Sequence, residues 1–185
     1  MNWENAKLHL GCGSKYLAGW INADGVAVPV VEGVAGHPDI VLDIHKECSL
    51  LPSNALAWIY TSHVIEHLYT DLLPGILTDL CRALRPGGRL TIATTDLDGI
   101  YLHRYKSPDN GDAWAAAMFG ECRSTDHPMA AHRDCFTYVK LGKLLADAGF
   151  SAVRPWEPGQ YPEILALRDY SVTARLVSLL IEGVK

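Results

Sequence analysis

The sequence predicts an α/β protein in which one domain, residues 1–185, forms a three-layer, doubly wound and mostly parallel sheet. Short apolar runs alternate with glycine turns and helical segments along the chain, which is the pattern of βαβ units. The runs are apolar enough for strands that are covered on both faces. Polar groups follow several of the runs, and the carboxyl ends of parallel strands are where open α/β sheets bind ligands.

The first two predicted strands enclose a glycine turn. Residues 8–10 lead into Gly11-Cys12-Gly13, and a second apolar run at residues 20–21 ends at Asp24. Glycines let the backbone approach a ligand closely, and turn amides can hold anionic or polar groups. A carboxylate at the tip of the next strand can accept two hydrogen bonds from a ribose diol. The stretch therefore predicts a nucleoside-type cofactor, with a plain glycine turn and a solvated Asp as the alternative.

Two further strands are predicted before the first long helix. Residues 25–38 form a Gly/Pro/Val-rich loop, and the apolar run at 39–43 suits a buried strand that ends in Asp43. Residues 55–61 are apolar and aromatic, as strands are, and stop at Ser62-His63. The four polar strand ends, at the glycine turn, Asp24, Asp43 and Ser62-His63, are expected to converge on one edge of the sheet.

The clearest helix is predicted at residues 71–85, where apolar residues recur at helical spacing. Asp71 is expected to cap its start, Pro74 is tolerable only in its first turn, and Pro86-Gly87-Gly88 stops it. Residues 89–94 then form the next predicted strand.

The second half of the chain begins with an atypical segment. Residues 97–136 mix aromatic side chains, His and Arg with Gly and Pro, and 113–119 is expected to form a short helix. We interpret 97–136 as a substrate-side insertion or lid, with a surface packing element as the alternative. Thr137 is expected to cap another helix, followed by a strand at 150–156. The apolar pattern of 171–185 fits a buried strand and a helix equally well.

Composition narrows the class of protein. Of the 185 residues 49% are hydrophobic and 20% are charged, as in folded globular proteins, and the net charge of −5 gives no basic excess for nucleic-acid binding. No apolar run is long enough to span a membrane, and the polar N-terminal residues are unlike a signal peptide. The 5 cysteines are scattered without a CxxC pair, which argues against a disulfide framework or a cysteine zinc site and predicts a cytoplasmic protein.

Together these segments resemble the small S-adenosylmethionine-dependent methyltransferases of the Rossmann-like class, in the methyltransferase domain known as type 11. The resemblance lies in the glycine turn and acid of residues 8–24, the acid, Leu-Pro pair, strand and Glu-His pair of 39–68, the helix, Pro-Gly-Gly and strand of 80–97, and the late helix of 132–150. Within that family, the abbreviated opening is similar to a subgroup with a short first helix. The resemblance implies a Rossmann-like methyltransferase fold with S-adenosylmethionine as the cofactor.

The resemblance also implies a cofactor site. Gly11, Cys12 and Gly13 would supply the turn against the methionine part, and Asp24 would bind the ribose hydroxyls. The other implied positions are Asp43 near the adenine amino group, Ile44 beside the ring, Ser62 by the methionine amino group and His63 towards the reacting side. The chain departs from the family at His9, where an acid is usual, and at Lys15, the third glycine position. The ribose end of the site is thus better supported than the methionine end.

The activity expected from the resemblance is methyl transfer to an oxygen or nitrogen acceptor on a small molecule or a saccharide precursor, without nucleic acid or membrane as partner. A hydroxyl acceptor must lose a proton, and a histidine with a pKa near neutrality suits that task. His63, His67 and His132 are the candidates for this base, in no preferred order.

Three alternatives compete with this interpretation. His63, Glu66 and His67 have the HxxEH spacing of a zinc hydrolase helix, but the motif follows a strand directly and no later segment offers an obvious third ligand, so no metal is predicted. A nicotinamide enzyme would need a third glycine where Tyr16 stands. A non-catalytic module that binds a nucleoside cofactor remains the main alternative.

Overall fold

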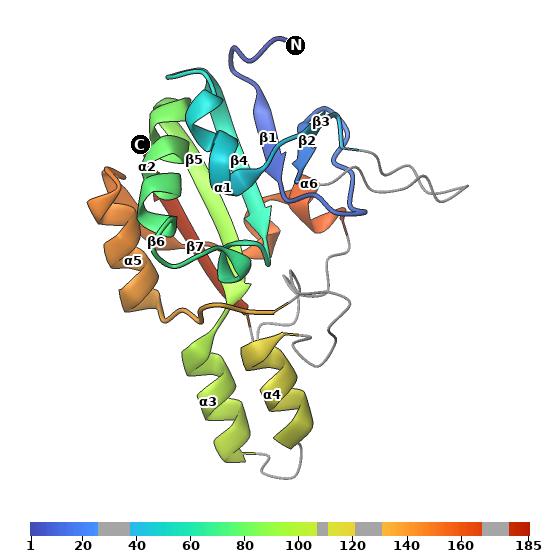
Figure 1. Cartoon of the computed structure of the whole chain (residues 1–185), viewed down its shortest axis with the longest axis vertical. Coiled ribbons are helices and arrows are strands. Elements are labelled where there is room, and N and C mark those ends of the chain that lie inside the picture. Colours follow the sequence, from blue (N-terminus) through green and yellow to red (C-terminus); the bar gives the residue numbers. More distant parts are fainter. Residues whose placement is uncertain (26–37, 107–110, 121–130, 168–177) are drawn as a thin grey trace.

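The computed structural model describes residues 1–25, 38–106, 111–120, 131–167 and 178–185 (Figure 1). Seven strands form one sheet in the order β3-β2-β1-β4-β5-β7-β6. Neighbouring strands from β3 to β5 are parallel, and β7 is antiparallel to both β5 and β6. The strands are β1 (Lys7–Leu10), β2 (Ile21–Asp24), β3 (Ile40–Val41), β4 (Leu56–Ser62), β5 (Leu84–Thr95), β6 (Ala152–Pro155) and β7 (Ser178–Val184). The predicted α/β architecture with a mostly parallel sheet is confirmed.

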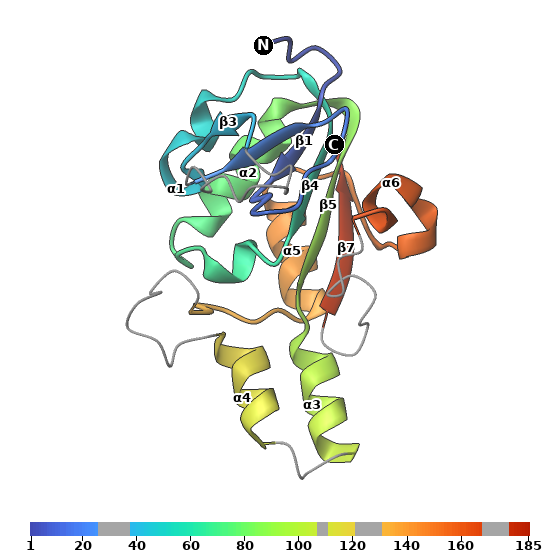
Figure 2. The same cartoon turned by 90° about the vertical axis from the view of Figure 1, so that its right-hand side faces the viewer.

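Helices cover both faces of this sheet. The helices α1 (Ile44–Glu47), α2 (Leu73–Ala83) and α5 (Tyr138–Asp147) lie on one face, and the short α6 (Pro162–Leu165) lies on the other (Figures 1 and 2). The main core fills the space under α2 and α5, where Leu77, Leu141 and Leu145 are fully buried. In the described part of the chain, no helix combines the length and the apolar character that crossing a bilayer requires.

The helix α2 confirms the periodicity of the sequence but starts differently from the prediction. It begins at Leu73, and the expected cap at Asp71 is wrong because the N-cap residue is Leu72, which makes no side-chain capping bond. A turn from Tyr69 takes the role of the cap, since its carbonyl accepts from the amides of Leu72 and Leu73, each at 3.0 Å. Pro74 lies in the first turn, as expected, and removes a further donor.

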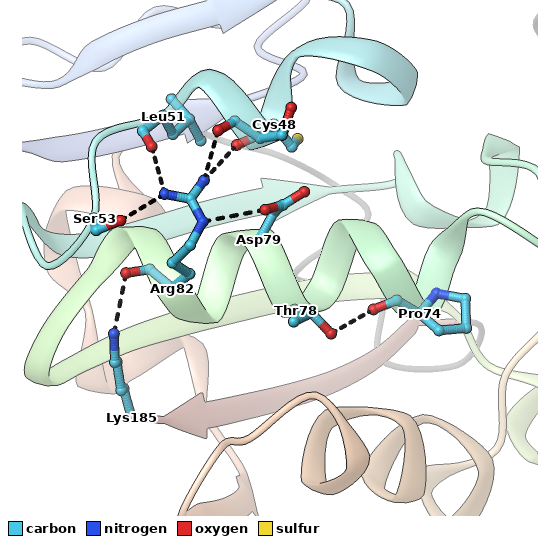
Figure 3. A network of polar contacts seen from close by, with 9 residues as sticks. Cys48, Leu51, Ser53, Pro74, Thr78, Asp79, Arg82 and Lys185 are labelled. Atoms are coloured by element: carbon cyan, nitrogen blue, oxygen red, sulfur yellow. Dashed lines mark hydrogen bonds and ion pairs between the residues drawn. The ribbon is translucent and has the colours of Figure 1, made fainter.

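A single arginine ties the end of α2 to the loop before β4. The Arg82 guanidinium donates to the carbonyl groups of Leu51 at 2.8 Å and Ser49 at 2.9 Å and to the Ser53 hydroxyl at 2.8 Å (Figure 3). It also pairs with Asp79 at 3.2 Å, one turn earlier on the same helix. Loop carbonyls that would otherwise lack partners are thus held by a residue on a rigid helix.

The strand predicted at residues 39–43 is shorter and less buried than expected. The structure has a two-residue strand, β3, at the edge of the sheet, and the Val41 side chain is 60% exposed. Asp39 lies just before β3: its amide donates to the Asn22 carbonyl at 2.7 Å, but its carboxylate, in place of a backbone carbonyl, accepts from the Asn22 amide at 2.7 Å. Most of the predicted loop before it, residues 26–37, lies outside the described residues.

Aromatic side chains pack on the face of the sheet opposite α2. The connection from β1 to β2 contains turns and no helix, so the short first helix suggested by the sequence is absent there. Trp20, Trp58 and Trp156 are buried on this side, with ring centroids of Trp20 and Trp58 4.8 Å apart. Tyr161, which directly precedes α6, lies 4.7 Å from Trp58 and extends the cluster.

Two segments in the second half of the chain were uncertain from the sequence, the one after β5 and the C-terminal one. Of the ambiguous segment 171–185, residues 178–184 form the strand β7, which is inserted between β5 and β6, and residues 171–177 lie outside the described residues. The segment after β5 forms α3 (Leu97–Lys106) and α4 (Gly111–Phe119), which lie side by side and project away from the sheet (Figures 1 and 2). The predicted helix at 113–119 falls within α4, whereas α3 was not predicted. Thr137 caps α5 as expected, since its hydroxyl accepts from the Lys140 amide at 3.1 Å.

We predict that Arg82→Met lowers the free energy of unfolding by about 1–3 kcal/mol, because it leaves several loop carbonyls without a donor while the apolar stem is kept. Urea unfolding measures the change. The matched control is Arg85→Met, which alters an exposed arginine three residues further on, at the start of β5, and should change stability by less than about 0.5 kcal/mol. Equal effects of the two substitutions would contradict the role given to Arg82.

Candidate functional site

The glycine turn after β1 is held tightly by its neighbours. Gly11 and Gly13 have positive φ angles of 71° and 50°, which favour glycine. The amides of Gly11 and Cys12 both donate to the Ala23 carbonyl, at 2.8 and 3.0 Å. A Cβ on Gly11 would lie 2.3 Å from Cγ2 of Val64, so only glycine lets the turn pack against the segment that follows β4.

Asp24 is bound directly to this turn. Its Oδ2 accepts from the Gly13 amide at 2.8 Å, so the acid at the end of β2 and the turn after β1 form one unit. Burial and the nearby Asp24 charge raise the pKa of the Cys12 thiol to about 11, which keeps it protonated at neutral pH. The expected cofactor turn and the expected ribose ligand are therefore adjacent at the carboxyl edge of the sheet.

Asp43 and Ile44 lie at the start of α1. The Asp43 carboxylate accepts from the His45 amide at 3.0 Å and pairs with Lys46 at 2.8 Å, and the hydrogen bond from Lys46 lowers its pKa. These contacts use two of the roughly four acceptor positions of a carboxylate, so an adenine amino group could still donate to it. The Ile44 side chain is buried. A cavity of about 190 Å³ beside it, lined also by Leu72 and Ile76, contains no residue of the glycine turn.

His63 follows Ser62 at the end of β4 and is held in a fixed orientation. Its φ of 50° is unusual for a residue other than glycine. Nδ1 lies 2.7 Å from Oε1 of Glu66, and Nε2 lies 3.1 Å from the Ser178 hydroxyl. An ionised carboxylate can only accept, so Nδ1 carries a proton whether or not the ring is charged. In the neutral ring Nε2 then has the lone pair.

Glu66 is the buried centre of the site. Its side chain is 0% exposed, and it accepts from Thr94 at 2.8 Å and Thr95 at 3.2 Å in addition to His63. Burial by itself raises the pKa of a carboxyl group, but the hydrogen bonds from His63 and Thr94 outweigh burial and lower the pKa of Glu66 below its usual value. Glu66 is therefore ionised at neutral pH.

His67 and His132 lie against each other next to Glu66. Their ring centroids are 4.7 Å apart, and Nδ1 of His67 lies 3.2 Å from the Ala131 carbonyl. Burial is the main cause that lowers the pKa of His132, so its ring is neutral at pH 7. The amide of Arg133 donates to the Glu66 carbonyl at 2.7 Å, which brings the segment containing His132 to the end of β4.

The HxxEH segment is not helical in the way a zinc hydrolase requires. His63 has left-handed backbone angles, and only the 3₁₀ helix η2 (Ile65–His67) follows it. His63, Glu66 and His67 thus do not share one face of an α-helix. The structure instead places His132, which the sequence offered only as a candidate base, beside Glu66 and His67.

The structure locates the two residues that depart from the family pattern and three site residues that the sequence did not predict. The departure His9 is buried and bonds to Asn22 at 3.2 Å, so it lies inside the sheet, and Lys15 is exposed. Thr94, Thr95 and Ser178 were not predicted. The polar Thr94-Thr95-Asp96 end of a strand was a usable signal for the first two, whereas Ser178 belongs to the segment whose structure was ambiguous.

Comparison with known proteins agrees with this geometry. Residues 7–154 match the family model described as a methyltransferase domain. No curated protein matches the chain significantly. Similar solved structures include an S-adenosylmethionine-dependent methyltransferase from Archaeoglobus fulgidus, with 14% identity, a TM-score of 0.57 and coverage of 100% of this chain and 87% of that one. Another such methyltransferase, from Mesorhizobium loti, has 17% identity, a TM-score of 0.56 and coverage of 100% and 93%.

A third similar structure is human N-acetylserotonin methyltransferase in complex with S-adenosylmethionine, with 14% identity and a TM-score of 0.57. It covers 98% of this chain and 47% of the human one. At these identities the structural similarity shows a shared fold and no more. The evidence on the family of this chain is the match of residues 7–154 to the family model.

We predict that Gly11→Ala destabilises the protein more than Gly13→Ala. Both substitutions place an L-residue at positive φ, at a cost of about 1–2 kcal/mol. Only Gly11→Ala also drives a methyl group into Val64, whereas a Cβ on Gly13 would meet nothing within 4 Å. The difference should be about 1–3 kcal/mol in urea unfolding. A larger effect at Gly13 would contradict the packing described for the turn.

We also predict that the wild type loses more stability than Glu66→Gln when the pH falls from 7 to about 4. The pKa of Glu66 is lowered in the folded state, so its contribution is complete above the unfolded-state pKa and is lost as the pH falls towards the folded-state pKa. Gln keeps the volume but cannot titrate. Unfolding curves of both proteins at several pH values give the difference between their free energies of unfolding. The other carboxyl groups are the same in both proteins, so their contributions cancel in this difference. Parallel pH profiles would contradict the assignment.

Proposed function

The chain belongs to the methyltransferase domain family, and from that premise we propose that it transfers a methyl group from S-adenosylmethionine to an oxygen or nitrogen acceptor on a small molecule or a saccharide precursor. The observation that carries the proposal is the orientation of His63 by a buried, ionised Glu66 at the end of β4. This histidine follows the strand end that lies next to the glycine turn, since Val64 packs on Gly11.

The residues at the edge of the sheet fit the cofactor. Gly11-Cys12-Gly13 would lie against its methionine part, and Asp24 would accept from the ribose hydroxyls while it holds the Gly13 amide. Asp43 and Ile44 would bind the adenine end, and Ser62 would lie by the methionine amino group. The fit rests on the open space beside Gly13, where a Cβ would meet nothing within 4 Å, and on the acid that ends β2 and the acid that follows β3.

The bound cofactor supplies a methyl group made electrophilic by its sulfonium. The chain has to align the acceptor, exclude water and remove a proton where the acceptor is a hydroxyl. Among His63, His67 and His132 we assign the base to His63, because Glu66 fixes its proton on Nδ1 and so keeps the lone pair on Nε2. This lone pair faces the Ser178 hydroxyl at 3.1 Å, so the acceptor's hydroxyl would have to take the place of Ser178 before its proton passes to Nε2. The same arrangement lets Glu66 stabilise the imidazolium that forms.

The acceptor is expected to reach the site beside residues 97–136, which we propose as the substrate-side insertion. The segment 131–134 supports this placement, because it contacts Glu66 and His67 directly. The net charge of −5 favours a small molecule or a saccharide precursor over nucleic acid. We also propose a cytoplasmic location, because the scattered cysteines fit a reducing compartment. A non-catalytic module that binds the same cofactor is the second candidate.

We predict that Asp24→Asn weakens S-adenosylmethionine binding by about 1–3 kcal/mol, because a charge-assisted hydrogen bond to the ribose is lost. Isothermal titration calorimetry with S-adenosylmethionine and S-adenosylhomocysteine measures the change. Asp71→Asn, which alters an exposed acid before α2, is the control and should bind like the wild type. No binding of either compound to the folded wild type would refute the proposed cofactor site.

We predict that His63→Asn lowers methyl transfer to a hydroxyl acceptor by about 10²–10⁴-fold while S-adenosylmethionine binding stays within a few-fold of the wild type. A panel of small-molecule hydroxyl, amine and saccharide acceptors with methyl-labelled cofactor identifies the reaction. Binding of the cofactor without transfer to any acceptor would favour the non-catalytic module.

A further inference from the structure

The proposed methyl transfer uses the Glu66–His63 pair and leaves His67 and His132 without a task. These two rings and the Glu66 carboxylate come from two segments, the 3₁₀ helix η2 and residues 131–134, which are far apart in the sequence. We propose that Glu66, His67 and His132 bind a divalent transition-metal ion. This proposal departs from the expectation drawn from the sequence, where no third ligand was visible.

The distances are compatible with a metal site after a small closure. Each of the three residues offers a ligand atom, and these atoms all lie within 4.8 Å of one another. Around a tetrahedral ion with bonds of about 2.1 Å, ligand atoms lie roughly 3.4 Å apart. Side-chain shifts on the order of 1 Å would therefore close the site, and these shifts would fall on His67 and His132, which are half-buried, because Glu66 is fully buried.

Hydrogen bonding prepares both histidines to act as ligands. The Ala131 carbonyl can only accept, so Nδ1 of His67 carries the proton and Nε2 keeps its lone pair. A backbone carbonyl on the second ring nitrogen is the arrangement that orients metal-bound histidines. Nδ1 of His132 is buried and has no hydrogen-bond partner among the described residues. An unpaired buried nitrogen is costly, and a bound ion would satisfy it.

Charge around the cluster sets which ion is favoured. Glu66 brings one negative charge, and its bonds to His63, Thr94 and Thr95 use about three of four acceptor positions. The Arg133 guanidinium donates to the His67 carbonyl at 2.8 Å, and its positive charge lowers the affinity for a cation. Two imidazoles with one carboxylate favour Zn²⁺ and neighbouring transition metals, and Mg²⁺ or Ca²⁺ would need oxygen ligands instead.

The test is metal titration of the 185-residue chain, without a tag, after dialysis against a chelator. Titration with Zn²⁺ by calorimetry and with Co²⁺ by visible absorption should show one saturable site, and Mg²⁺ should not compete. His132→Ala and His67→Ala should each weaken Zn²⁺ binding by at least about 10- to 100-fold. His103→Ala, which removes a histidine from α3, is the matched control and should bind Zn²⁺ like the wild type.

Two results would overturn the proposal: no saturable Zn²⁺ or Co²⁺ binding by the wild type, or unchanged binding in both His67→Ala and His132→Ala. Circular dichroism identifies a variant that has lost its fold, and in that case His67→Gln or His132→Gln replaces it. The metal-free protein should still bind S-adenosylmethionine, because the glycine turn and Asp24 are not part of the cluster. Failure of the metal site and failure of the proposed methyltransferase site are thus measured separately.

Discussion

The buried carboxylate of Glu66 is the constraint on which the site depends. Moving an ionised carboxyl group out of water costs several kcal/mol unless hydrogen bonds compensate for the lost hydration. Here the compensation comes from His63 after β4 and from Thr94 and Thr95 at the end of β5. Neither segment can move without leaving a buried charge unpaired. The left-handed backbone of His63 and the direction of its ring follow from this requirement.

The sheet is covered on its two faces by different means, and this positions the site. On one side α2 and α5 pack as conventional helices. On the other side the connection from β1 to β2 has no helix, and tryptophans cover the strands while their indole N–H groups bond within the sheet, Trp58 to Thr91 and Trp156 to the Ile92 carbonyl, both at 2.9 Å. Buried tryptophans need such partners. Because no helix lies between β1 and β2, the connection after the glycine turn is short, and the Gly13 amide can bond to Asp24 at the end of β2.

The sequence predicted what depends on local pattern and missed what depends on contacts between distant segments. Helical spacing predicted α2 and α5, and the rule that parallel strands share a carboxyl edge predicted the meeting of the glycine turn with Asp24. The hydroxyl partners of Glu66 were missed because hydroxyls at a strand end have no distinctive spacing. His132 was a candidate base, but its contact with Glu66 and His67 was missed because these residues lie 65 or more positions earlier. The predicted length of β3 was wrong because the Asp39 carboxylate, in place of a backbone carbonyl, accepts from the Asn22 amide.

The insertion of β7 between β5 and β6 has a consequence for the order of folding. Although β6 precedes β7 in the chain, β7 is its only partner among the described strands, so β6 joins this sheet only after β7 has aligned along β5. That alignment closes a loop of more than 80 residues, and closing long loops is slow because chain entropy is lost before contacts are gained. The parallel strands β1, β4 and β5, which carry most of the edge described above, can assemble earlier and await this final pairing.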